Sequence, residues 1–153
     1  MITIFAVGKA HEPHIKDAIA LYESRLKRFC KLEWVLIPHA GNADVERLKT
    51  LESDAILAKI QPDDLVILLD ERGQQWSSPE FAAKLEGWQA TTRGRIIFII
   101  GGAYGVDARV SKRADATWSL SKLVFPHQLV RVILLEQLYR GYAIIHKLPY
   151  HHE

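Results

Sequence analysis

Four short apolar runs, each bounded by turn residues, recur through the first hundred residues of the chain. They read ITIFAVG (2–8), LEWVLIP (32–38), LVILLD (65–70) and RIIFIIG (95–101). Runs of this length, rich in β-branched residues, are typical of strands that are buried on both faces of a parallel sheet. The pattern therefore predicts four buried strands.

Between these runs the apolar residues recur at helical spacing. A first helix is predicted from Ile15, Ala18, Ile19, Tyr22, Leu26 and Phe29, and a second from Val45, Leu48, Leu51, Ala55 and Ile56, with a possible cap at Asn42. A third helix is predicted to begin after Ser77, because Glu80 follows at the spacing of a capping box and Pro79 suits a first turn.

After Gly101 the pattern changes. A short helix is predicted over 106–114, a brief extended piece at TWSLS (117–121), a tight stretch SKLVFP (121–126), and a long helix from about His127 to His146. Strands that alternate with helices are typical of an α/β fold, with a parallel sheet and helices on both of its faces. We expect the whole chain, 1–153, to form one such domain.

The composition is that of a globular protein with no membrane span. Hydrophobic residues make up 48% and charged residues 25% of the 153 residues, and no run of about twenty apolar residues is present. The start, MITIFAVGKAHEPH, lacks the basic leader of a secretory signal. The lone Cys30 also argues against a disulfide-bonded secreted domain. These features predict a cytoplasmic location.

Charge alone leaves the partner open. A net charge of +2 with seven histidines is mild for a nucleic-acid-binding protein. Basic residues cluster in two places, at Arg25, Lys27, Arg28 and Lys31 and at Arg109, Lys112 and Arg113. Taken by itself, each cluster is better interpreted as a solvated helix face.

The glycines of RIIFIIGGAYGVD (95–107) indicate close approach of backbone to a ligand, or merely a turn that caps a helix. They do not form a dinucleotide-binding motif, because the G-G-x-x-G spacing follows the fourth strand rather than the first, and no P-loop is present. Ligands of open α/β sheets bind at the carboxyl ends of strands. Two candidate loops therefore follow the third and fourth strands, LLDERG and IIGGAYG.

Other catalytic and metal sites have less support in the sequence. Ser111 and His127 cannot be assigned to a hydrolase triad, because no G-x-S-x-G motif presents the serine. His146, His151 and His152 have no acidic or cysteine partner at a recognised zinc spacing. We expect no metal site.

Three stretches taken together resemble one family. They are LLDERG (68–73), IIGGAYG (99–105) and WSLSKLVFPHQLVRVILLEQLYRGYAIIHKLPYHHE (118–153). They resemble the RlmH family of ribosomal RNA methyltransferases, the minimal members of the SPOUT superfamily. The resemblance covers essentially the whole chain and is carried chiefly by PHxLVR, ExLYR and PYH. One departure is at Ala103 and Tyr104, where the family often has G-G-P-x-G; the glycines themselves are intact.

The resemblance implies a C-terminal trefoil knot, which periodicity cannot predict because threaded chains are almost never observed. It also implies S-adenosylmethionine as the cofactor, held by three loops. The implied cofactor-binding residues are Leu69, Asp70, Gly102, Ser121, Lys122, Leu123, Val124, Phe125 and Pro126.

The implied reaction is methylation of N3 of a pseudouridine in 23S ribosomal RNA, on the assembled ribosome. The candidate catalytic residues are His127, Arg140, Tyr150 and His151. Arg140 would favour the imide anion or hold a phosphate, either histidine would take the N3 proton, and Tyr150 would stack on the base. The alternatives are an ion pair of Arg140 with Glu136, a helix-start role for His127 and tail packing for Tyr150.

A homodimer is implied as well, and the final helix gives it independent support because it is apolar around much of its circumference. Either it is buried on two sides within one chain, or it meets a second chain. Two other functions stay open: a non-catalytic RNA-binding module with the same fold, and an unrelated nucleotide-binding α/β protein.

Overall fold

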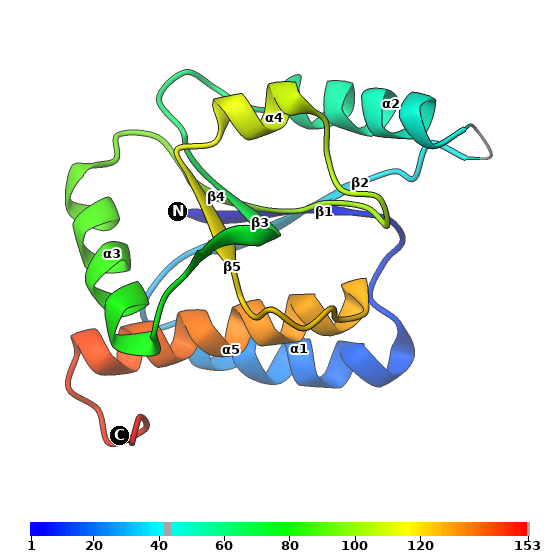
Figure 1. Ribbon diagram of the computed structural model, residues 1–153. Helices are drawn as coiled ribbons and strands as arrows, with labels where there is room; N and C mark the ends of the chain where they lie inside the picture. Colours follow the sequence, from blue (N-terminus) through cyan, green and yellow to red (C-terminus); the bar gives the residue numbers. More distant parts are fainter. Residues whose placement is uncertain (42–43, 153) are drawn as a thin grey trace.

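A computed structural model describes residues 1–41 and 44–152, in which strands and helices alternate (Figure 1). The elements are β1 (Ile2–Val7), α1 (Pro13–Leu26), β2 (Leu32–Ile37), α2 (Val45–Leu57), β3 (Leu65–Gln75), α3 (Ser78–Thr91), β4 (Ile96–Ile100), α4 (Ala108–Arg113), β5 (Ala116–Ser119) and α5 (His127–Ile145). The four strands and the helices predicted from periodicity are confirmed, and the extended piece near TWSLS is the fifth strand.

All strand pairs in the sheet are parallel, and their order is β2-β1-β4-β3-β5. The predicted parallel α/β fold is therefore confirmed. Successive connections run in opposite directions across the sheet, and connections of one handedness then place their helices on opposite faces. Helices α1, α3 and α5 cover one face, whereas α2 and α4 cover the other (Figure 1).

The central strands are apolar throughout because the sheet has a hydrophobic core on each side. In β1, Ile2 and Ile4 pack into the core beneath α1, α3 and α5, whereas Phe5 and Val7 pack into the core beneath α2 and α4. Every residue of β4 is likewise buried. Burial on both faces explains why these strands appear in the sequence as continuous apolar runs.

The predicted start of α3 is confirmed in detail. The backbone N–H of Ser77 donates to Oε1 of Glu80 at 2.9 Å, and the backbone N–H of Glu80 donates to the Ser77 hydroxyl at 3.1 Å, which is a complete capping box. The possible cap at Asn42 lies outside the described residues. The side chain of Asp44 caps α2 by accepting from the backbone N–H of Arg47 at 2.9 Å.

Strand β3 is longer than the sequence pattern predicts, because it continues past Asp70 after a bulge. Leu69 and Gln74 both pair with Trp118 of β5, so that residues 70–73 are looped out of the ladder. A Cβ at Gly73 would lie 2.5 Å from the carbonyl oxygen of Thr117, which only a glycine avoids. The bulge carries LLDERG to the carboxyl edge of the sheet.

Helix α5 lies between α1 and α3 and is buried against both as well as against the sheet. Leu134, Leu135 and Leu138 are fully buried there. Packing within one chain thus accounts for much of the apolar circumference of this helix. A stripe of less buried residues remains on its outer side, at Leu129, Ile133, Glu136, Arg140 and Ile144.

Candidate functional site

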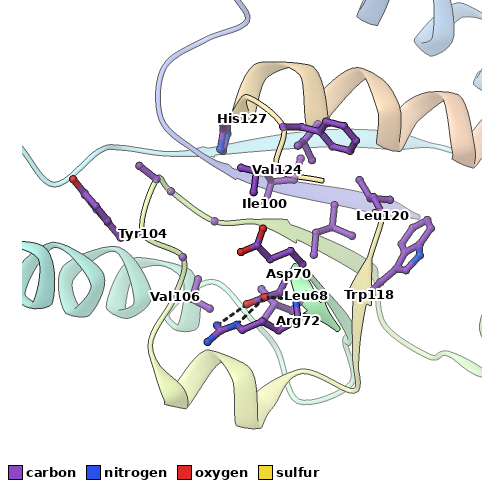
Figure 2. Close-up of a pocket in the computed structure, with 18 of the residues that line it drawn as sticks. Leu68, Asp70, Arg72, Ile100, Tyr104, Val106, Trp118, Leu120, Val124 and His127 are labelled. Atoms are coloured by element: carbon purple, nitrogen blue, oxygen red, sulfur yellow. Dashed lines mark hydrogen bonds and ion pairs between the residues drawn. The ribbon is translucent and has the colours of Figure 1, made fainter. Parts of the chain in front are cut away.

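A cavity of about 490 Å³ opens at the carboxyl ends of β3, β4 and β5 (Figure 2). Three loops and the start of α5 form its walls. The lining residues are Lys49, residues 68–72, residues 100–106, Trp118, Leu120, Ser121, residues 123–125, His127 and Val130. Its volume lies in the range of small-molecule sites, and strand carboxyl ends are where α/β sheets bind ligands.

The loop after β4 forms one wall and has no room for a side chain at its centre. A Cβ at Gly102 would lie 2.6 Å from Oε1 of Glu52 and 3.3 Å from Val7. Glu52 comes from α2, is 3% exposed, and accepts from the backbone N–H of Ala40 at 3.3 Å. Gly105 has φ +78° and donates back to the Gly102 carbonyl, which closes the turn. The glycines therefore serve close backbone packing.

The bulge of β3 forms a second wall with a paired charge. Nη2 of Arg72 lies 2.8 Å from the Asp70 carboxylate, and the backbone N–H of Arg72 also donates to it at 2.9 Å. These hydrogen bonds from Arg72 outweigh partial burial and lower the pKa of Asp70. Asp70 consequently stays ionised at neutral pH beside the cavity.

The loop after β5 forms the third wall and exposes apolar side chains. Two hydrogen bonds hold its shape: the Ser119 hydroxyl donates to the Ser121 carbonyl at 2.9 Å, and the Leu123 N–H donates to the Ser121 hydroxyl at 3.0 Å. Leu123 is nevertheless 69% exposed and Val124 is 79% exposed. Side chains of this kind on the rim of a cavity offer apolar surface to a ligand or to a second chain.

His127, the first residue of α5, lies at the cavity wall, as labelled in Figure 2. Its Nε2 is 3.3 Å from Nη2 of Arg131, one helical turn further on. Burial and the Arg131 charge lower the pKa of His127, although a hydrogen bond with the Gly101 backbone opposes this shift. The ring is therefore neutral at physiological pH, and its position also fits the helix-start role that the sequence left open.

Most of the residues expected to hold the cofactor do surround this cavity. Leu69, Asp70, Gly102, Ser121, Leu123, Val124 and Phe125 line it, whereas Lys122 and Pro126 are not among its lining residues. The cavity thus brings together three loops that are up to about fifty residues apart in the chain.

The other three catalytic candidates lie together at the far end of α5. Nε of Arg140 is 2.7 Å from Oε1 of Glu136, so the ion pair considered from the sequence is present. Nη1 of Arg140 is 3.1 Å from Nδ1 of His151, and the guanidinium carbon lies 4.8 Å from the ring centre of Tyr150. Tyr150 also packs edge-on against Tyr139. We call Arg140, Tyr150 and His151 the tail cluster.

A sharp turn after α5 brings the tail back to this cluster. Lys147 adopts φ +56°, and the Leu148 N–H donates to the Ala143 carbonyl at 2.8 Å, as at many helix C-termini. His127 and Arg140 are thirteen residues apart on one straight helix, which separates them by about 20 Å along its axis. Within one chain, the tail cluster and the cavity are therefore separate.

Two residues near the cavity were missed as functional candidates. Trp118 is 2% exposed and stacks on Phe81, with ring centres 4.3 Å apart, at the base of the cavity wall. Arg131 is fully buried behind His127. Both residues belong to the stretch that carries the family resemblance, Trp118 in WSLSK and Arg131 in PHxLVR. Their place in these motifs is the sequence feature that could have indicated a function for them.

Neither a metal site nor a membrane-spanning helix is found in the described part of the chain. No group of three or more histidine, cysteine, aspartate or glutamate side chains there is arranged to hold a metal ion. No helix in residues 1–41 and 44–152 combines the length and the apolar character that crossing a bilayer requires.

Comparison with known proteins decides the family. The model of a family described as predicted SPOUT methyltransferase matches residues 1–151. The chain belongs to the RlmH family of SPOUT methyltransferases. It is 41% identical to ribosomal RNA large subunit methyltransferase H of Acetivibrio thermocellus, over 98% of each chain. It is 43% identical to the protein of the same name from Desulfovibrio desulfuricans, over 96% of this chain and 94% of the relative.

Structural comparison agrees at the level of the fold. A probable methylase family protein from Haemophilus influenzae Rd KW20 superposes with a TM-score of 0.60 at 12% identity, covering 95% of this chain and 66% of that one. The trefoil knot expected in the C-terminal part follows from membership of the SPOUT family. In this chain the RlmH resemblance and the cavity involve the same three segments, at the bulge of β3 and after β4 and β5.

Replacing Gly102 with alanine tests the packing of the glycine loop. Because the new Cβ would meet buried Glu52 at 2.6 Å, we expect the free energy of unfolding to fall by about 1–3 kcal/mol, as in other overpacked sites. Gly87→Ala is the matched control: a Cβ at this exposed position in α3 meets nothing within 4 Å, so alanine should raise stability by about 0.5–1 kcal/mol. Urea unfolding measures both, and an unchanged Gly102→Ala would contradict the close packing.

Proposed function

We propose that this protein transfers a methyl group from S-adenosylmethionine to N3 of a pseudouridine in 23S ribosomal RNA, with the assembled ribosome as substrate. The observation that carries the proposal is the cavity at the carboxyl ends of β3, β4 and β5 in a chain of this family. Relatives about 40% identical over nearly the full length are named ribosomal RNA large subunit methyltransferase H, which supports ribosomal RNA as the substrate class.

The cavity residues fit S-adenosylmethionine. Gly102 leaves its backbone free to approach a ligand, and exposed Leu123 and Val124 offer apolar surface to an adenine ring. The ionised Asp70 is a suitable partner for a positively charged or hydroxyl-bearing group. Bound there, S-adenosylmethionine supplies a methyl group attached to a positively charged sulfur. The phosphate motifs absent from the sequence are not needed, because this cofactor has no phosphates.

The residues of the tail cluster fit the substrate side of the reaction. N3 of pseudouridine is an imide nitrogen that must lose or share its proton before it accepts a methyl group. A guanidinium such as that of Arg140 stabilises the anion that develops on the ring. Nδ1 of His151 accepts a hydrogen bond from Arg140, so this ring takes the N3 proton there only after Arg140 has turned to the substrate. Tyr150 has the flat surface on which a base stacks.

The separation of the tail cluster from the cavity calls for a second chain. A two-fold axis perpendicular to α5 pairs two copies of the helix antiparallel, so that residues at equal distances on either side of the crossing point become neighbours. A crossing near Ile133 on the outer stripe would bring Arg140 of one protomer beside His127 of its partner. The exposed apolar residues Leu123, Val124 and Leu129 would then be covered. We infer a homodimer in which each tail completes the other protomer's site.

Methyl transfer from tritiated S-adenosylmethionine tests the function. Whole ribosomes, separated subunits and naked ribosomal RNA from cells lacking this protein are offered as substrates. Labelling of whole ribosomes at one 23S pseudouridine, with little labelling of naked RNA, is expected because the substrate must be presented in its folded context. Cofactor binding without any transfer would point to a non-catalytic RNA-binding module, and no binding at all would exclude the methyltransferase.

Removal of the Arg140 guanidinium separates catalysis from cofactor binding. Arg140→Ala is expected to lower kcat by at least about a hundredfold, the usual scale for one electrostatic group in the transition state, and to change the Kd of S-adenosylmethionine by less than about threefold. Arg93→Ala, at an exposed arginine in the loop before β4, is the control. Single-turnover kinetics and calorimetry supply the two values; an unaltered rate would remove Arg140 from the mechanism.

Mixed dimers test the shared site. A chain with the cavity wall altered by Asp70→Lys and an Arg140→Ala chain carry different tags, and the heterodimer is isolated by both. One intact cavity then meets one intact tail, so about half of the wild-type activity should return although each homodimer is inactive. An inactive heterodimer, or a monomer in sedimentation, would overturn the shared site.

A further inference from the structure

Arg131 is a buried cation whose hydrogen-bonding partners among the described residues are histidines rather than carboxylates. It is 0% exposed. Its Nη1 lies 3.1 Å from Nδ1 of His11, and its Nη2 lies 3.3 Å from Nε2 of His127. Its buried Nε has no hydrogen-bond partner in the described part of the chain. Glu12 acts on Arg131 through its charge but makes no hydrogen bond with it among those that the structure describes. Arginine is rarely buried so fully without a hydrogen-bonded carboxylate, so this arrangement requires an explanation.

The guanidinium dictates the protonation of both rings. Arginine has only donors, so Nδ1 of His11 and Nε2 of His127 must act as acceptors, which requires neutral imidazoles. For both rings, burial lowers the pKa and the Arg131 charge lowers it further. With Nε2 of His127 occupied, its single proton resides on Nδ1, and the ring also hydrogen-bonds with the backbone of Gly101.

Arg131 acts on the cavity through His127. His127 lines the cavity together with Gly101 and Gly102, whereas Arg131 lies one helical turn behind it and does not line the cavity. On its other side Arg131 reaches the loop after β1: a Cβ at Gly8, where φ is +122°, would lie 3.8 Å from Nη2. The arginine therefore links the strand ends of β1 and β4 to the start of α5.

We propose that Arg131 is a positioning residue that holds His127 neutral and in one orientation, so that the cavity accepts a ligand with a positively charged sulfur. The identity of that ligand rests on the proposed function. A protonated His127 would place a positive charge in the cavity wall itself, next to the bound sulfur, where like charges repel strongly. The Arg131 charge lies one helical turn behind and does not line the cavity. An ionised carboxylate behind His127 would favour its protonation, whereas a guanidinium opposes it.

Other ionisable groups surround the two histidines and the cavity and must be kept constant in a test. They are His11 and Glu12 in the loop after β1, Lys16 on α1, Lys49 on α2, Asp70, Glu71 and Arg72 on β3, and Tyr104 in the glycine loop. The experiment therefore compares two ligands that differ only in the charge on sulfur, S-adenosylmethionine and S-adenosylhomocysteine.

Arg131→Met is the decisive variant, with binding of both ligands measured by calorimetry at pH 8 and at pH 5.5. In the wild type, the ratio of the Kd of S-adenosylmethionine to that of S-adenosylhomocysteine should change by less than about twofold between pH 8 and pH 5.5. Arg131→Met removes the charge that opposes protonation of His127, although burial still lowers its pKa. On going from pH 8 to pH 5.5, the Kd of S-adenosylmethionine should therefore rise at least about twofold more than that of S-adenosylhomocysteine. Arg131→Lys, which keeps a donor cation, should resemble the wild type.

Two further measurements secure the interpretation. In a His127→Gln background, Arg131→Met should produce no pH-dependent change in the ratio of the two Kd values, because the ring in the cavity wall is gone and His11, which remains, does not line the cavity. Nitrogen NMR of the wild-type imidazoles should place the His127 proton on Nδ1 without any ligand. Because it uses the wild type, this measurement tests the proposal even if Arg131→Met does not fold. A proton on Nε2, or an unchanged ratio in Arg131→Met, would overturn the proposal. If the wild type binds neither ligand, the methyltransferase proposal fails, whereas the NMR result still decides the histidine arrangement.

Discussion

The close packing of backbone at the carboxyl end of β4 is the constraint on which the site depends. Gly102 faces a buried carboxylate from α2 at a distance at which an added Cβ would force Glu52 to shift. Because all five strands are parallel, the loops after β3 and β5 end at the same edge and close the cavity around that glycine. Gly73 has the same role one strand away, where the chain passes against Thr117. Both glycines therefore serve close packing beside the cavity.

Helix α5 divides the chemistry between its two ends. Its first turn supplies a neutral histidine beside the cavity, backed by a buried arginine. Its last turns supply the guanidinium of Arg140, against which the returning tail places Tyr150 and His151. A positively charged sulfur is favoured beside neutral and acidic groups, whereas an imide anion is favoured beside Arg140. In the proposed reaction, the opposite electrostatic demands of donor and acceptor would be met at the two ends of one helix, and a second protomer would unite them.

Periodicity predicted the strands and helices well because each core strand is buried on both faces, and the helices before α5 each bury one apolar face. It could not predict the bulge of β3, since the requirement for glycine at position 73 is set by Thr117, 44 residues later. The burial of Arg131 was also hidden, because an arginine on a helix is ordinarily exposed. The thirteen-residue spacing of His127 and Arg140 on one predicted helix is itself enough to imply that they lie far apart within one chain. The knot and the cofactor contacts came from resemblance alone.

A crystal structure with S-adenosylmethionine tests the central claim most directly, because it locates the methyl donor without reliance on turnover. The account predicts the donor in the cavity between Gly102 and Leu123, with its sulfur near His127 and a second protomer across the outer stripe of α5. A donor bound elsewhere, or a cavity that stays empty at saturating concentration, would contradict it.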